Sequence, residues 1–166
     1  MAEYTQELKN ISNIPKNIHI AFITADFNNQ YTDQMEEITS DVLEENHFRN
    51  ITRYRVPGAF EIPGMIERVM ENGTFDLIYC FGVVIRGATT HYDYVCNETA
   101  RGIMDATRKY KTPIIFGLLT CENSKQVDDS FESISERLKE VYFSKIKSFL
   151  SIPNKIYSVM INDLLL

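Results

Sequence analysis

The chain has 166 residues, 44% of them hydrophobic, which suits one domain with its own core over residues 1–166. Its formal net charge of −6 and its lack of a basic tract with interleaved aromatic residues argue against a nucleic-acid-binding protein. No run reaches the ~18 apolar residues of a membrane span. The first residues do not resemble a signal peptide, so we expect a cytoplasmic protein without membrane contact.

The three cysteines do not indicate a covalent framework or a metal centre. Cys80, Cys96 and Cys121 show neither CxxC spacing nor an even count. We therefore expect no metal site and expect the thiols to behave as small apolar side chains.

Strands and helices alternate along the chain. Residues 1–16 are polar and are expected to form an arm or a short edge strand. The pattern then predicts, in chain order, a strand at 18–25, a helix at 31–46 with Thr32 near its start, a strand at 51–56, a helix from 62 to Asn72-Gly73, a strand at 77–85, a helix at about 91–110, a strand at 113–120 and a long helix between Phe131 and Phe149. The apolar tail at 156–166 is expected to pack on this domain or on a neighbour. This alternation predicts an α/β fold, a parallel sheet with helices on both faces.

Candidate functional side chains follow three of the strands. Phe27 and Asn28 come after the first strand, Glu61 after the second, and His91 after the third. Because ligands of such sheets bind beyond the carboxyl ends of the strands, we expect these residues at one edge. There an aromatic ring can stack on a flat ligand, a carboxylate can accept from hydroxyl groups and a histidine can move protons.

Each of these residues also has a simpler interpretation. Phe27 alone is more typical of a core residue, and Glu61 is a favourable charge at a helix start. Thr89 or Thr90 is as well explained by helix capping. A histidine in the first turn of a helix is favoured in its neutral form, which suits proton acceptance. The small and hydroxyl residues at 87–90 also suit an anion, without the Gly-Lys-Ser/Thr of a P-loop. The convergence of these residues at one edge favours a site.

Three segments carry a resemblance to a known family: VPGAFEIP at residues 56–63, GVVIRGATTHYDYVCNE at 82–98 and IFGLLT at 115–120. From about residue 18 to about residue 126 the chain closely resembles the lumazine synthases of riboflavin synthesis. The resemblance implies a flavodoxin-like, three-layer αβα sandwich around a four-stranded parallel sheet. It also implies homopentamers, in some members a sixty-subunit icosahedral shell, and riboflavin synthase as a possible partner.

The reaction that this resemblance implies joins 5-amino-6-(D-ribitylamino)uracil to 3,4-dihydroxy-2-butanone 4-phosphate. The product is 6,7-dimethyl-8-ribityllumazine, phosphate and water are released, and no cofactor is needed. The roles implied are, in chain order, Phe27 stacking on the pyrimidine with Asn28 beside it, Ala59, Phe60 and Glu61 holding the ribityl chain, Val83, Val84 and Ile85 lining the uracil pocket, Ala88 and Thr89 binding phosphate, His91 transferring protons, and Phe116 contributed by a neighbouring subunit.

The sequence departs from the family pattern in its last third, residues 121–166, which we expect to be helical. Ser130 stands where the family carries an arginine, and residues 134–139 replace a basic, glycine-rich loop. Leu138 stands at a phosphate-binding lysine position, with Arg137 and Lys139 beside it as candidate substitutes.

Three hypotheses follow from the sequence. The first is an active lumazine synthase. The second is a catalytically weakened family member that acts as a shell-forming or flavin-binding protein. Asp26, where many relatives carry an arginine, adds a negative charge near the expected anion and bears on this alternative. The third is an unrelated flavodoxin-like binding module.

Overall fold

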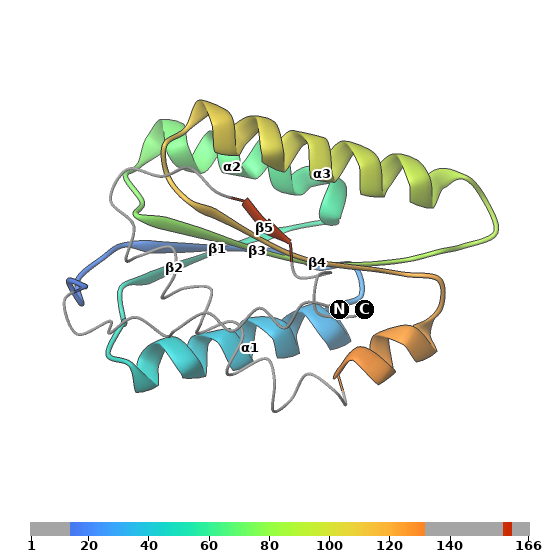
Figure 1. The fold of residues 1–166 in the computed structure, drawn as a ribbon, viewed down its shortest axis with the longest axis horizontal. Coiled ribbons are helices and arrows are strands. Elements are labelled where there is room, and N and C mark those ends of the chain that lie inside the picture. The colour runs from blue at the N-terminus through green and yellow to red at the C-terminus, as the bar shows by residue number, and fades with distance from the viewer. Residues whose placement is uncertain (1–13, 132–157, 161–166) are drawn as a thin grey trace, which may run out of the picture.

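The computed structural model describes residues 14–131 and 158–160, and it places a parallel β-sheet between two layers of helices (Figure 1). The elements are β1 (Ile20–Ala25), α1 (Asn29–Glu45), β2 (Ile51–Val56), the 3₁₀ turn η1 (Ala59–Glu61), α2 (Ile62–Asn72), β3 (Leu77–Ile85), α3 (His91–Lys109), β4 (Ile114–Cys121) and β5 (Ser158–Met160). Residues 124–131, just after β4, are also helical.

The strands lie in the order β2-β1-β3-β4-β5, and all pairs are parallel. The predicted α/β fold with a four-stranded parallel sheet is confirmed. β5 adds three residues of the C-terminal tail, because Ser158 and Met160 pair with Ile114 and Phe116 of β4. The predicted arm up to residue 13 and the predicted helix beyond Phe131 lie outside the described residues. Within the described part of the chain, no helix is long and apolar enough to cross a membrane.

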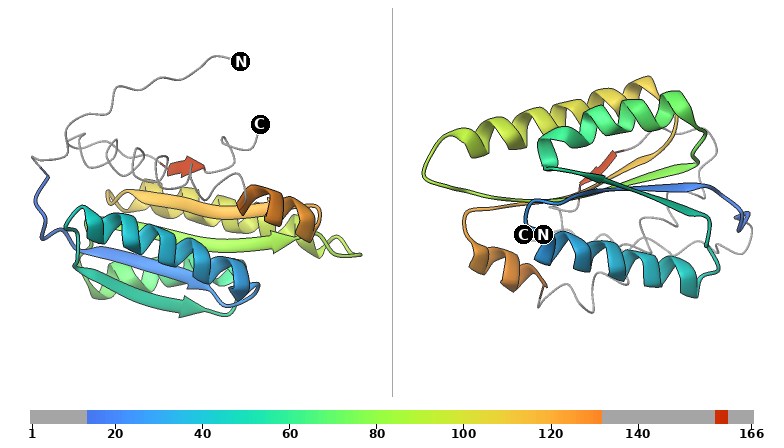
Figure 2. Two further views of the ribbon diagram at one scale, coloured as in Figure 1. Left: turned by 90° about the horizontal axis from the view of Figure 1, so that it is seen from below. Right: turned by 180° about the vertical axis from the view of Figure 1, so that it is seen from behind.

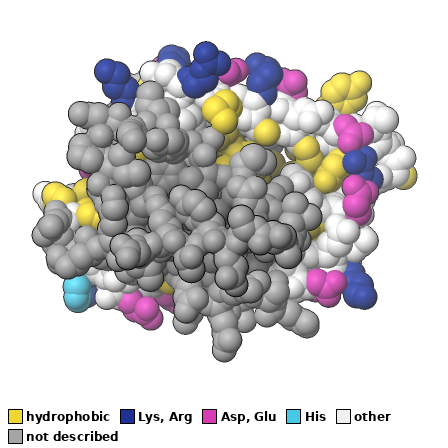
Figure 3. Space-filling model, viewed as in Figure 1, with side chains coloured by type: hydrophobic (Ala, Val, Ile, Leu, Met, Phe, Trp, Pro, Cys, Tyr) yellow, Lys and Arg dark blue, Asp and Glu magenta, His cyan; other side chains and the backbone are white. Residues whose placement is uncertain are grey.

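Helices lie on both faces of the sheet (Figure 2), and the side chains of each face form a separate hydrophobic core. Ile20 and Phe22 of β1 point toward α1 and residues 124–131, whereas Ala21 and Ile23 point toward α2 and α3. Because helices cover both faces, every side chain of β1 is buried. On the face drawn in Figure 3, basic and acidic side chains lie along the edge formed by α2 and α3.

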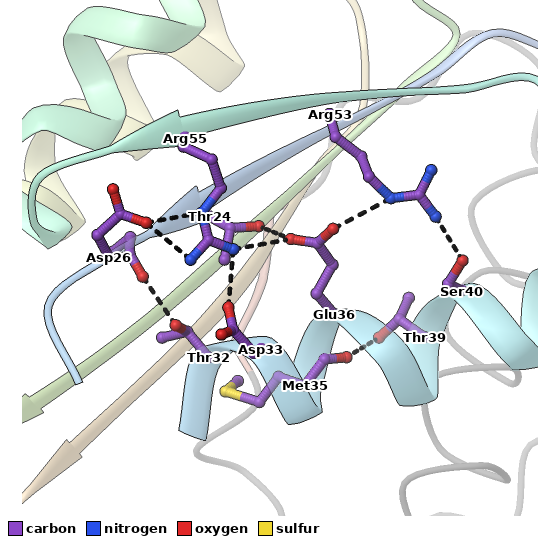
Figure 4. Close-up of polar contacts among 11 residues, drawn as sticks. Thr24, Asp26, Thr32, Asp33, Met35, Glu36, Thr39, Ser40, Arg53 and Arg55 are labelled. Carbon is purple, nitrogen blue, oxygen red and sulfur yellow. Dashed lines mark hydrogen bonds and ion pairs between the residues drawn. The ribbon is translucent and has the colours of Figure 1, made fainter. Parts of the chain in front are cut away.

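A polar cluster fastens α1 to the edge of the sheet (Figure 4). Glu36, whose side chain is 13% exposed, accepts from Thr24 of β1 and from Arg53 of β2, the latter at 3.1 Å. Arg53 also donates to Ser40 at 2.6 Å. Thr32, which the sequence places at the start of the helix, lies one turn inside it, and its buried hydroxyl donates to the Ala25 carbonyl at 2.7 Å. The Thr32 hydroxyl therefore ties α1 to β1 rather than capping it.

Gly117 of β4 provides a test of how closely the strands of the core are packed. A Cβ at this position would lie 2.2 Å from the Cys80 carbonyl oxygen, a backbone atom that cannot rotate away. We expect Gly117→Ala to lower the free energy of unfolding by about 3 kcal/mol or more, the upper end for overpacking. Urea unfolding followed by circular dichroism measures this change.

Gly64→Ala is the matched control, because no atom would lie within 4 Å of the new Cβ. In a helix, alanine is favoured over glycine by up to ~1 kcal/mol, so stability should stay the same or rise. An equal loss in both variants would contradict the packing explanation.

Candidate active site at the carboxyl edge of the sheet

The central strand β3 runs past the end of its neighbour β1. β1 ends at Ala25, level with Val56, the last residue of β2. The pairing of β1 with β3 stops at Thr24 and Phe81, whereas β4 stays beside β3 as far as Ile85. In the described part of the chain, the last residues of β3 thus have a neighbouring strand on one side only. The open flank forms a step in the sheet edge.

Asn28 lies in this step and holds Phe27 at its rim. Its backbone is left-handed, with φ 62° and ψ 39°, a conformation that asparagine tolerates better than most residues. Its side-chain amide donates to the Val83 carbonyl at 2.8 Å, and the Phe27 N–H donates to the Pro57 carbonyl at 2.9 Å. The Phe27 side chain is 72% exposed. The interpretation of Phe27 as a core residue is therefore wrong.

The turn η1 packs against β3 beside the step. Gly82 has no side chain, and a Cβ there would lie 3.4 Å from that of Ala59, so Gly82 allows the close approach. Ala59 is buried, while Phe60 is 54% exposed and Glu61 is exposed. A Cβ on Gly58 would lie 3.2 Å from the Glu61 carboxylate, so the glycine leaves room for that group. An aromatic ring and a carboxylate thus flank the step.

The segment from β3 to α3 brings His91 to the same edge. Residues 87–90 and His91 are exposed. Thr90 makes no side-chain capping bond, whereas the Thr89 hydroxyl accepts from the His91 N–H at a long 3.4 Å. The capping interpretation thus holds weakly for Thr89 and not for Thr90. A helix start of this kind, at the head of the 19 residues of α3, favours a bound anion.

The remaining predicted residues divide between the edge and the core. Val83 and Ile85 lie on the α1 side of the sheet and Val84 on the α2 and α3 side, all next to the step. Phe116 is 5% exposed in the middle of β4, level with Cys80. Within one chain it does not reach the edge, and its role at a neighbour's site stays a prediction.

The negative charge of Asp26 is paired at this edge. Its carboxylate lies 2.7 Å from the Arg55 guanidinium, which also holds Asp33 at 2.8 Å (Figure 4). Arg55 comes from β2 and faces α1, so the pair depends on a contact between distant segments. Among the described residues, no group of three or more His, Cys, Asp or Glu side chains could hold a metal ion.

Arg86 is a structural residue of the edge that the sequence pattern does not single out. Its guanidinium lies 2.9 Å from Asp93 of α3 and 2.7 Å from Glu122, just after β4. Hydrogen bonds from Arg86 lower the pKa of the Asp93 carboxyl below its usual value. The position of Arg86 directly before the 87–90 loop is the only local signal. Glu122 carries none, because it comes from another strand.

Comparison with known proteins decides the family. A family model described as 6,7-dimethyl-8-ribityllumazine synthase matches residues 17–140. The chain belongs to the 6,7-dimethyl-8-ribityllumazine synthase family. A synthase of that name from Campylobacter concisus is 46% identical over 112 residues, 66% of this chain and 72% of the relative. Those from Campylobacter curvus and Campylobacter hominis are 44% and 43% identical over 109 residues, 64% of this chain and 70% of each relative.

Position 130, where the lumazine synthase pattern leads us to expect an arginine, carries a buried hydroxyl. Ser130 is 5% exposed and donates to the Gln126 carbonyl one turn earlier at 2.6 Å. Its side chain thus lies against its own helix. Leu138 and the candidate substitutes Arg137 and Lys139 lie outside the described residues.

Asn28 tests how the step is built. Asn28→Ala removes the bond to the Val83 carbonyl and places alanine in a left-handed conformation. We expect it to lower the free energy of unfolding by about 2–3 kcal/mol, from a lost bond of about 1 and strain of about 1–2. Asn28→Gly removes only the bond and should cost about 1 kcal/mol. Urea titration measures both, and equal losses would exclude the left-handed backbone as a cause.

Proposed function

We propose that this protein condenses 5-amino-6-(D-ribitylamino)uracil with 3,4-dihydroxy-2-butanone 4-phosphate to 6,7-dimethyl-8-ribityllumazine in riboflavin biosynthesis. The observation that carries the proposal is the convergence of Phe27, Glu61 and His91 on one sheet edge in a chain of the lumazine synthase family. Phosphate and water are released, and no cofactor takes part.

The step beside β3 receives the ribitylaminouracil. The exposed ring of Phe27 stacks on the pyrimidine, with Asn28 next to it. Along a strand, alternate residues point their backbone groups to the same side, so the N–H and C=O of Ile85 face the open flank with those of Val83. These groups match the amide edge of a uracil. At the turn η1, the Glu61 carboxylate accepts hydrogen bonds from hydroxyl groups of the ribityl chain.

The start of α3 receives the phosphate of the second substrate. Ala88 and Thr89 leave room for backbone N–H groups, and the helix dipole favours the anion. Imine formation, phosphate elimination and ring closure each need a proton transfer, which His91 supplies from its place beside that loop. Holding two substrates side by side provides much of the acceleration, because it converts a bimolecular step into a unimolecular one.

Turnover of the two substrates tests this proposal. Purified protein incubated with both compounds should form 6,7-dimethyl-8-ribityllumazine, detected by its absorbance and by chromatography against a standard. The same mixture without protein gives the background rate. No rate above background at high substrate concentrations would contradict the proposal.

A second candidate is a family member that binds the ligands with little turnover. The buried Ser130 at the expected arginine position favours it, because a charge-assisted contact is worth roughly 1.5–3 kcal/mol. Calorimetry with riboflavin and with ribitylaminouracil separates the two. Tight binding without product formation supports the weakened enzyme, whereas normal turnover excludes it.

An assembly of several copies completes the proposed site. Phe60, Tyr94 and Met104 are 54%, 67% and 45% exposed, which leaves apolar surface for neighbouring subunits. We place a pentamer first, a sixty-subunit shell of pentamers second, and riboflavin synthase as a candidate partner. Sedimentation velocity distinguishes the assemblies, and co-purification tests the partner.

Phe27 tests the stacking role. Phe27→Ala should raise the Kd for ribitylaminouracil roughly 5- to 150-fold, since stacking of a base on an aromatic ring is worth about 1–3 kcal/mol. Phe27→Tyr keeps the ring and should bind within about twofold of the wild type. The KM for the butanone phosphate should change little in either variant. Equal weakening for both substrates would point to a folding defect instead.

His91 tests the proton-transfer role. His91→Asn keeps a polar side chain but cannot exchange protons near neutral pH, so kcat should fall about 100-fold. The control is His47→Asn at the end of α1, where φ is 68° and asparagine is tolerated. It should leave kcat unchanged. A fall in both variants, or in neither, would contradict the role of His91.

A further inference from the structure

Arg86 connects three segments that meet at the site. It is the first residue after β3, and its N–H donates to the Cys121 carbonyl at the end of β4 at 2.9 Å. Its guanidinium donates two hydrogen bonds, of 2.9 and 3.2 Å, to the Asp93 carboxylate in the first turn of α3. The Nε side lies 2.7 Å from Glu122, and the group stacks 4.1 Å from the centre of the Tyr92 ring. In Figure 3, basic and acidic side chains lie together at the end of the molecule where β3, α3 and β4 meet.

The loop at residues 87–90 lies between two fixed points. Arg86 fixes its beginning, and Tyr92 and Asp93, both in contact with the guanidinium, fix its end. His91 lies directly before Tyr92, so the same contacts restrain the backbone from which the His91 side chain extends. The loop itself is exposed. We call the group of Arg86, Tyr92, Asp93 and Glu122 the clamp, because its contacts restrain both ends of the loop.

We infer that Arg86 is a positioning residue, which holds the phosphate-binding loop and His91 in place relative to β3 through its fork to Asp93 and Glu122. This inference rests on the function proposed for the same site. All three guanidinium nitrogens are engaged with carboxylates, so Arg86 acts through the loop rather than as a phosphate ligand. The planar fork matters, because lysine carries the charge without the paired geometry.

Arg101 offers a matched control on the same helix. It also pairs with two carboxylates, Glu98 and Asp105, the latter at 3.1 Å. All three residues belong to α3, so this group connects no separate segments. Arg101→Lys therefore reports what the loss of an arginine fork does to α3 alone.

The experiment compares Arg86→Lys, Asp93→Asn and Arg101→Lys by steady-state kinetics on the full-length protein. For Arg86→Lys and Asp93→Asn we expect kcat to fall and the KM for the butanone phosphate to rise, each roughly 10- to 100-fold, as misplaced groups do. The KM for ribitylaminouracil should stay within about twofold, because the clamp does not touch Phe27 or Glu61. Arg101→Lys should match the wild type.

A second readout does not depend on turnover. Backbone hydrogen exchange of residues 87–93 should become faster in Arg86→Lys and Asp93→Asn and stay unchanged in Arg101→Lys. Glu122→Gln removes the charge of one partner and keeps the fork to Asp93, so it should show the same effects in weaker form. It serves as the test variant if Arg86→Lys does not fold.

Two results would overturn the inference. If Asp93→Asn tightens binding of the butanone phosphate while Arg86→Lys weakens it, the freed guanidinium is a phosphate ligand and not a positioning group. If backbone hydrogen exchange of residues 87–93 and both KM values are unchanged in Arg86→Lys, Arg86 does not position the loop. An inactive wild-type protein overturns the proposed function alone, because the exchange measurement still shows whether Arg86 holds the loop.

Discussion

The bond from the Asn28 amide to the Val83 carbonyl is the contact on which the edge of the sheet depends. β3 extends beyond the end of β1. A buried carbonyl left without a partner there would lower the stability of the fold by about 1–3 kcal/mol. Asn28 satisfies it only because its backbone takes a left-handed conformation. Asn28 directly precedes α1, and the ring of its neighbour Phe27 is exposed. One side-chain amide thus satisfies a carbonyl of β3 at the step, next to the exposed aromatic ring.

Two glycines, which have no side chain, allow the close packing on which the rest of the edge depends. Gly82 lets η1 approach β3, and Gly117 lets β4 lie against the Cys80 carbonyl. A Cβ at Gly117 would collide with that carbonyl, and a Cβ at Gly82 would crowd Leu118 and Ala59. The site therefore depends on close packing inside the sheet as much as on the polar residues at its end.

Much of this arrangement could be predicted from the sequence, because it follows from periodicity and from the rule for parallel sheets. The strands, the helices and the shared edge of Phe27, Glu61 and His91 are of this kind. The Phe27 residue by itself could not decide between a stacking role and a core position, since one aromatic residue in a loop carries no burial signal of its own. The left-handed Asn28 depends on a carbonyl 55 residues away. The clamp of Arg86 depends on Glu122, which only the folded sheet brings near.

This member departs from the expected family pattern at position 130, where Ser130 stands in place of an arginine. The chain carries a net charge of −6, and Arg55 and Arg86 already pair with carboxylates at the site. A helix start stabilises an anion by about 0.3–1 kcal/mol and by up to ~2 in favourable geometry, whereas each charge-assisted contact adds roughly 1.5–3 kcal/mol. The α3 terminus therefore does not replace an arginine at position 130. Phe27 and His91, the residues proposed for stacking and proton transfer, are both exposed at the edge. Under the proposed function, phosphate affinity is therefore the property in which this protein should differ most from its relatives.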